Sequence, residues 1–251
     1  MGEIVMPGTY MLPSLATVFH ALYAAGGVNN VGTLRDVVLY RNGKAFKHVD
    51  VYDYIMNGNN SFDITLQDGD LINVGTYEKI VTVVGKVKRP MRYEMKGEES
   101  LTQLLEYAGG FASDAYKKNV NVSRKGDSEF QIYTVNNADF ADFILADGDS
   151  IMIDPIISRY ENRVTVDGAV YRPGNYAINS SIKTVKDLIN LVEGPREDAF
   201  LNRTILYREK EDLTKEMLAV DLGKLLRGEI DDILLKKNDR LYVPSATELR
   251  G

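Results

Sequence analysis

The chain has 251 residues, of which 44% are hydrophobic, and its formal net charge is −6 at pH 7. This length is long for one domain and comfortable for two or three. The acidic balance disfavours sequence-independent binding of nucleic acid, which depends on Lys and Arg neutralising phosphates. The absence of cysteine excludes disulfides, thiolate metal sites and cysteine nucleophiles. No apolar run reaches the roughly 18 residues that a membrane-spanning helix needs.

One phrase occurs three times at a constant interval. VTVVGKVKRPMRY begins at residue 81, VTVDGAVYRPGNY begins at residue 164, and the opening GEIVMPGTY matches the same phrase without its first part. Its proline, at 7, 90 and 173, recurs every 83 residues (90 − 7 and 173 − 90). Its glycine, at 2, 85 and 168, and its tyrosine, at 10, 93 and 176, keep that interval. The period predicts tandem modules.

The recurring phrase predicts a β-hairpin at the start of each module. VTVVGKV alternates apolar and polar residues and is rich in β-branched side chains, which is typical of a strand. Gly85 inside it indicates a bulge or the close approach of another backbone segment. The Arg89-Pro90 pair ends the strand, because proline donates no N–H. Tyr93 then lies in a second, short strand.

A helix is expected after each hairpin, with apolar residues at positions i, i+3, i+4 and i+7. Its three copies cover residues 17–27, 100–110 and 184–194. The expected N-cap residues are Thr17, Ser100 and Thr184. Ser100 followed by Gln103 has the form of a capping box. The expected C-caps are Gly27, Gly110 and Gly194.

Further strands complete each module. One contains Arg41, Arg124 or Arg208 at its end, and the last follows Gly69, Gly148 or Asn238, residues that tolerate a left-handed turn. A small mixed sheet with one main helix is the β-grasp arrangement, so the fold class is α+β with three tandem modules. The predicted boundaries are 1–78, 79–160 and 161–251.

The first copy of the phrase begins at its glycine and lacks the half-strand in front of it. We therefore expect that residue 1 lies inside a longer protein. The first module should then have an incomplete first strand and an unpaired sheet edge.

The combined pattern resembles the soluble-ligand-binding β-grasp (SLBB) family. It reads V-x-V-x-G-x-V-x-x-P-x-x-Y, then T-V-x-x-x-L-x-x-A-G-G, then D-G-D-x-I-x-V. The resemblance covers essentially the whole chain and is greatest to the tandem SLBB modules of Wza-like bacterial polysaccharide export proteins of the outer membrane. The third module departs from the pattern at Glu193 and Asn238.

This resemblance implies periplasmic modules, associated with the outer membrane in the full-length protein, that stack into a ring or tube for capsule or exopolysaccharide. The implied partners are export-apparatus subunits or further copies of the chain, with polysaccharide as a possible ligand. No signal peptide is visible in this chain. The pore-forming helix and the separate export domain of such proteins are expected outside it.

The residue patterns offer no catalytic or metal site. The DGD triplets at 68–70 and 147–149 favour turns over calcium loops, because the third copy is KND and a Ca²⁺ loop needs six or more oxygens. His20 and His48 lie in different elements without the partners that activate a nucleophile. We therefore predict no cofactor, no metal and no enzymatic turnover.

The candidate ligand-binding residues are Arg89, Tyr93, Arg172 and Tyr176, around the repeated proline turn. Aromatic faces beside planar polar groups are typical of sugar-binding sites. A structural role is the alternative, because tyrosine is common on half-buried strands and because the feature recurs in several modules.

Two functions from different classes remain open. One is a structural and interaction region of a polysaccharide export protein. The other is a soluble β-grasp module that binds a small molecule or an oligosaccharide. A module with a polar or aromatic site that its siblings lack would favour the second. A capsule-processing enzyme, a weaker alternative, would need paired carboxylates in one cleft.

Overall fold

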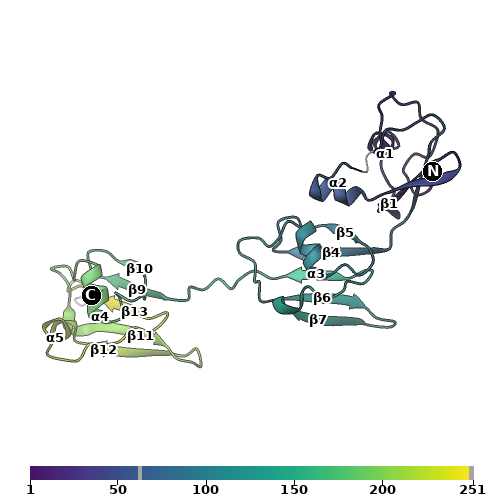
Figure 1. Cartoon of the computed structure of the whole chain (residues 1–251). Helices are drawn as coiled ribbons and strands as arrows, with labels where there is room; N and C mark the ends of the chain where they lie inside the picture. Colours follow the sequence, from purple (N-terminus) through teal and green to yellow (C-terminus); the bar gives the residue numbers. More distant parts are fainter. Residues whose placement is uncertain (62–63, 249–251) are drawn as a thin grey trace. The chain divides into compact units, whose positions relative to one another are not determined.

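The computed structural model describes residues 1–61 and 64–248 and divides into two compact units, residues 1–157 and 158–251. The first unit contains two sheets and the second unit contains one (Figure 1). Each sheet packs against one main helix, which confirms the predicted α+β class with repeated modules. Among the described residues, no helix is long and apolar enough to span a membrane.

The second module has a five-stranded mixed sheet in the order β5-β4-β8-β6-β7. β4 and β8 run parallel, and the other neighbours are antiparallel. Its elements are β4 (Lys79–Gly85), β5 (Arg92–Met95), α3 (Leu101–Tyr107), β6 (Asn119–Lys125), β7 (Phe130–Asn136), the 3-10 helix η1 (Asn137–Asp139) and β8 (Ser150–Ile153).

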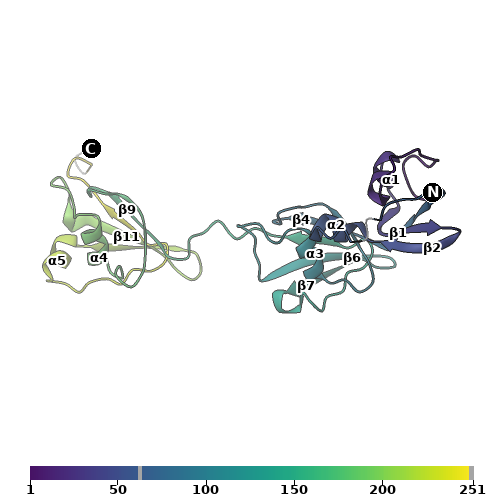
Figure 2. The same ribbon diagram turned by 45° about the horizontal axis from the view of Figure 1, so that its top comes forward.

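The third module, which forms the second unit, repeats this topology in the order β10-β9-β13-β11-β12. Its helix α4 lies against the sheet in both views (Figures 1 and 2). Its elements are β9 (Arg163–Gly168), β10 (Gly174–Ala177), α4 (Val185–Leu191), η2 (Leu201–Arg203), β11 (Thr204–Glu209), β12 (Lys215–Val220), α5 (Leu222–Arg227) and β13 (Arg240–Val243).

The first module has a three-stranded sheet in the order β2-β1-β3. A single parallel bridge between Gly2 and Val74 stands where its siblings have a parallel strand pair. The expected incomplete first strand stays a prediction. Its elements are α1 (Val18–Ala24), β1 (Gly32–Arg41), β2 (Lys44–Val49), α2 (Val51–Asn57) and β3 (Leu71–Thr76).

The short helices α2 and α5 were not predicted from the sequence. Each begins at an aspartate that caps the first turn, since Asp50 accepts from the Tyr52 N–H at 3.0 Å and Asp221 from the Lys224 N–H at 3.0 Å. Each ends at a glycine in the left-handed region, Gly58 or Gly228. These caps were the available signal, but no apolar stripe recurs at this place, because the second module has the 3-10 helix η1 there.

The recurring glycine makes a close backbone contact, as predicted. Gly85 and Gly168 have φ of +89° and +87°, and a Cβ at either would lie 2.1 Å from the carbonyl oxygen of the last strand, at Ile153 or Val243. Glycine is the residue that allows both this φ and this approach. The first strand of each of these modules can therefore lie against its last strand.

The helix ends differ in detail from the prediction. The C-cap of α3 is Ala108, and the two glycines after it close the helix, because Gly109 donates to the Glu106 oxygen and Gly110 to the Leu105 oxygen. This is the Schellman pattern. The other main helices end in the same way, so the predicted C-caps at Gly27, Gly110 and Gly194 are the second residue after the cap.

The capping box expected at Ser100 is wrong, because the Ser100 side chain makes no cap hydrogen bond and Gln103 donates to Glu106 instead. The structure places capping boxes in α1, between Thr17 and His20, and in α4, between Thr184 and Asp187. Neither His20 nor Asp187 is the Glu or Gln of the usual motif, so the motif pattern does not reveal these boxes.

Candidate functional site

The predicted ligand-binding residues form two pairs, one in each of the last two modules. The Tyr93 hydroxyl donates to the Arg89 carbonyl oxygen at 2.7 Å, and the Tyr176 hydroxyl donates to the Arg172 carbonyl oxygen at 2.7 Å. Tyr93 is 1% exposed and belongs to its module's core. Each tyrosine therefore closes the proline turn of its own hairpin.

The two arginines join the same turn to the end of the main helix. Arg89 donates through Nη2 to the Tyr107 carbonyl oxygen at 2.8 Å, and Arg172 donates through Nε to Glu193 at 2.8 Å. These contacts give both pairs a structural role. Ligand contact at Arg89, Tyr93, Arg172 and Tyr176 stays a prediction.

The second aspartate of each DGD-like turn forms a buried ion pair that sequence analysis did not anticipate. Asp149 accepts from Nε and Nη2 of Arg124 at 2.9 and 2.7 Å, and from the Ala146 N–H at 2.9 Å. Asp70 with Arg41, and Asp239 with Arg208, make the same bidentate contact. The hydrogen bonds from Arg41 hold the pKa of Asp70 below its usual range. The triplet is thus a turn closed by an arginine, as the turn interpretation favours.

The histidines make ordinary local contacts. His20 Nδ1 accepts from the Thr17 N–H at 3.2 Å, and His48 lies 2.6 Å from Asp36 on exposed surface. Within residues 1–61 and 64–248, no group of three His, Asp or Glu side chains could hold a metal ion.

The first unit contains a polar network where its two modules meet. Arg35, on β1, is 6% exposed and donates to Asp50 at 2.9 Å and to Glu99 at 2.8 and 3.0 Å. It also donates to the Glu94 carbonyl oxygen at 2.9 Å. Its guanidinium lies 4.6 Å from the ring centroid of Tyr52. One cation thus connects a strand and a helix cap of the first module with the hairpin of the second.

Further contacts complete this Arg35 network. The Glu94 carboxylate accepts from the Thr33 hydroxyl and from the Leu34 N–H, at 2.8 Å for the latter. The Tyr107 hydroxyl donates to Glu99 at 2.7 Å, and its ring meets Tyr52 edge-on at 5.4 Å. Tyr52 therefore packs into the core of the neighbouring module.

The pKa values of the network differ in direction. Burial raises the pKa of Glu94, and the hydrogen bonds from Thr33 and Leu34 only partly offset this. Burial also acts to raise the pKa of Glu99, but the hydrogen bonds from Arg35, the Lys96 N–H and Tyr107 outweigh it and leave that pKa lowered. The Arg35 guanidinium remains charged, because its bonds to Glu99 and Asp50 exceed the cost of burial.

The residues of this network belong to one junction and are not part of the repeat. The residues at the positions that align with Arg35, Glu94 and Glu99 in the following module are Lys118, Ala177 and Lys183. Sequence reasoning missed the network, because its members are scattered over β1, β5 and the helix caps. The available signal was that these charged residues differ from the residues at the same positions in the following module.

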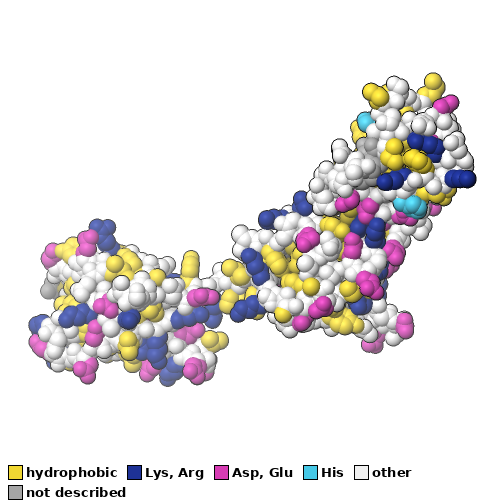
Figure 3. Space-filling model, viewed as in Figure 1, with side chains coloured by type: hydrophobic (Ala, Val, Ile, Leu, Met, Phe, Trp, Pro, Cys, Tyr) yellow, Lys and Arg dark blue, Asp and Glu magenta, His cyan; other side chains and the backbone are white. Residues whose placement is uncertain are grey.

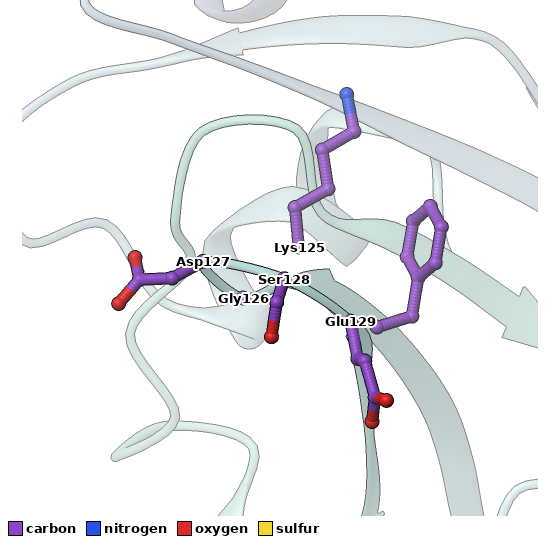
Figure 4. Close-up of a pocket in the computed structure, with 6 residues that line it drawn as sticks. Lys125, Gly126, Asp127, Ser128 and Glu129 are labelled. Carbon is purple, nitrogen blue, oxygen red and sulfur yellow. The ribbon is translucent and has the colours of Figure 1, made fainter.

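Two hollows on the described part of the surface do not gather reactive groups. One, of about 190 Å³, lies at the β6–β7 hairpin tip between Lys125 and Phe130. Figure 4 shows its Lys125, Asp127 and Glu129 side chains pointing in different directions. The other, of about 550 Å³, lies beside β3 and is lined by Met1, Tyr40, Gly43, Gly69, Leu71 and Asn73.

Comparison with known sequences places these features in a family. SLBB domains match residues 1–74, 80–133 and 162–243. Two curated sequences of the polysialic acid transport protein KpsD from Escherichia coli are each 26% identical to this chain over 234 residues. That alignment covers 89% of the chain and 40% of each relative. Each matched stretch lies within one of the three modules, and the chain belongs to the SLBB domain family.

Proposed function

We propose that the chain is a non-catalytic region of a bacterial polysaccharide export protein that works in the periplasm next to the outer membrane. Its modules would contribute to a ring or conduit for capsule or exopolysaccharide, in contact with export-apparatus subunits or further copies. The likeness to a polysialic acid transport protein over 89% of the chain is the observation that carries this proposal.

The junction in the first unit supports an architectural role. A buried arginine with several acceptors fixes the orientation of two modules far better than a flexible linker would. The subunits of a conduit need a defined shape, and two modules held in a fixed orientation can provide one.

A deletion in the source bacterium tests this function. The full-length protein without the region of residues 1–248 is compared with the intact protein for surface polysaccharide, with immunoblots of membrane fractions as the control for its level. We expect surface polysaccharide to be lost while the protein remains in its fraction. Wild-type surface polysaccharide in the deletion strain would contradict the proposal.

A further inference from the structure

One sheet face of the third module differs from the same face in its siblings. Side chains of alternate residues on a strand point to opposite faces, and Val164, Val166, Leu206 and Leu241 fill the core under α4. Their neighbours Thr165, Asp167, Tyr207, Arg240 and Tyr242 therefore lie on the face opposite α4, which we call the open face. None of these five residues is buried.

The open face places two tyrosines around an ion pair. Arg240 donates through Nε to Asp167 at 2.6 Å, and its guanidinium lies 5.8 Å from the Tyr207 ring centroid. Tyr242 is the strand neighbour of Asp167, and its ring lies over Gly168. Tyr207 and Tyr242 are diagonal neighbours across β11 and β13, a separation within reach of one ligand.

Hydrogen-bonding groups continue along the same face. The Thr165 hydroxyl donates to the Asn175 side chain at 2.8 Å. The Arg240 side chain is 54% exposed, so its terminal nitrogens remain accessible to a ligand. Aromatic faces beside a few placed donors and acceptors are the usual composition of a site for a polar organic ligand.

The charge on and around this face favours an acidic ligand. Its cationic side chains outnumber its acidic ones, although the chain as a whole is acidic. The cations are Arg159, Arg163, Lys215 and Arg240, and the acids are Asp167, Glu209 and Glu248, which accepts from the Tyr242 hydroxyl at 2.9 Å. Within the described residues Arg163 forms no ion pair, its buried Nε lacks a hydrogen-bond partner, and its guanidinium lies 5.3 Å from the Tyr160 ring. In Figure 3, Lys and Arg side chains lie on the second unit near the β11–β12 hairpin, beside Asp and Glu side chains.

The sibling modules lack this combination. The strand registers align Tyr207 with Ser123, Arg240 with Ser150 and Tyr242 with Met152. In the first module, Tyr40 aligns with Tyr207, but the residues aligned with Arg240 and Tyr242 are Leu71 and Asn73. The face is thus particular to one module, as expected of a binding site and not of a feature that every copy needs to fold.

We propose that the open face of the third module binds an acidic oligosaccharide. Tyr207 and Tyr242 stack on sugar rings, and Asp167 and Asn175 bind hydroxyl groups. Arg240 and Arg163 hold a carboxylate, for which the planar guanidinium fork is suited. The inference rests on the proposed export function, since it names the class of polymer that this region contacts.

A titration of the whole chain tests the face. The probes are an α2,8-linked sialic acid hexamer and a hyaluronan hexasaccharide, with neutral maltohexaose for comparison, all at near-physiological salt so that weak surface attraction is screened. We expect saturable binding of at least one acidic probe, amide shifts confined to β9, β11 and β13, and affinity for maltohexaose at least about tenfold lower.

A triple variant distinguishes specific binding at the open face from nonspecific binding elsewhere on the chain. Tyr207→Ser, Arg240→Ser and Tyr242→Met together give the third module the residues that the second module carries, so the sheet should still fold. The matched control replaces Ile132 and Met152, on the equivalent face of the second module, by Ser. We expect the first variant to lose at least about tenfold in affinity and the control to lose none.

Three results would overturn the proposal. These are no saturable binding of either acidic probe at millimolar concentration, equal binding of maltohexaose, and unchanged affinity in a folded triple variant. The proposed export function fails separately, if the deletion strain described above keeps its surface polysaccharide. Binding in vitro without an export defect can therefore be distinguished from an export defect without binding in vitro.

Discussion

Gly168 is a residue at which the first strand of the third module closely approaches its last strand. Gly168→Ala would place a methyl group 2.1 Å from the Val243 carbonyl oxygen in a left-handed conformation. We expect a loss of about 2–4 kcal/mol in the free energy of unfolding, from left-handed strain and the steric clash together. Gly228→Ala is the control, since Gly228 has φ of +77° with open space around it and should lose only about 1 kcal/mol. Urea unfolding measures both, and equal losses would contradict the close-contact argument.

Arg35 is the residue on which the first junction depends. Arg35→Ala leaves Asp50 and Glu99 without their shared cation, and breaking a buried pair in this way costs about 3–5 kcal/mol. The control is Lys86→Ala, which removes the exposed pair with Asp114 and should cost at most about 1 kcal/mol. Chemical denaturation of the first unit compares them, and a loss below about 1 kcal/mol for Arg35→Ala would show that the junction is not stabilising.

The same network predicts a pH dependence. The pKa of Glu99 is lowered in the folded chain, so its contribution to stability is present above its unfolded pKa and is lost as pH falls through the folded pKa. Glu94 acts in the opposite direction because its pKa is raised. We expect the free energy of unfolding, measured in urea, to fall less between about pH 7 and about pH 4 in Glu99→Gln than in the wild type. An identical loss in both proteins would show that Glu99 does not contribute to the pH dependence of stability.

Among the helices, α4 ends with a conformational penalty. Glu193 has φ of +65° at the position where α1 and α3 have glycine, and its side chain keeps an exposed ion pair with Arg172. Glu193→Gly removes strain of about 1–2 kcal/mol and loses a pair worth at most about 1 kcal/mol. We expect Glu193→Gly to match or exceed the wild type in thermal melting, while Glu193→Ala falls below it. The reverse order would show that the ion pair outweighs the strain.

The repeated elements were predictable because their signals are local. Strand alternation, the helix stripe and the glycine after each helix each lie within about a dozen residues, and they reappear at nearly constant spacing, which for the helix is 83 (100 − 17) and 84 (184 − 100) residues. The helices α2 and α5 are about as long as the main helices, but the second module has the 3-10 helix η1 at the corresponding place, so no apolar stripe recurs there in all three modules. The capping box was assigned to the wrong helix, because α1 and α4 complete theirs with His20 and Asp187, which are residue types outside the usual motif.

The candidate sites were less predictable, because they depend on residues far apart in the chain. Arg35 and Glu99 are separated by 64 positions, and Asp167 and Arg240 by 73. The tyrosines at the proline turn were visible in the sequence because they recur. Tyr207 and Tyr242 do not recur as a pair, and only the strand register brings them to one face.

Considering the chain as a whole, its division into two compact units makes the predicted boundary near residue 160 testable. Residues 156–162 are all exposed and include Arg159. We expect brief trypsin digestion to cut after Arg159 and leave two folded fragments, identified by mass spectrometry and circular dichroism. Lys79, near the other predicted boundary, should resist cleavage because it lies in β4 and its amine binds two carbonyl oxygens. Early cleavage at Lys79 would contradict a single first unit.

The arginine–aspartate pairs at the DGD-like turns also bear on protein engineering. Arg41 and Asp70, Arg124 and Asp149, and Arg208 and Asp239 enclose segments of different lengths, with separations of 29, 25 and 31 residues. The closing contact is nevertheless the same in all three. Natural variation has thus already changed what lies between these residues without altering how the sheet is closed. The β6–β7 tip at Gly126–Ser128 is accordingly a suitable place for a reporter peptide.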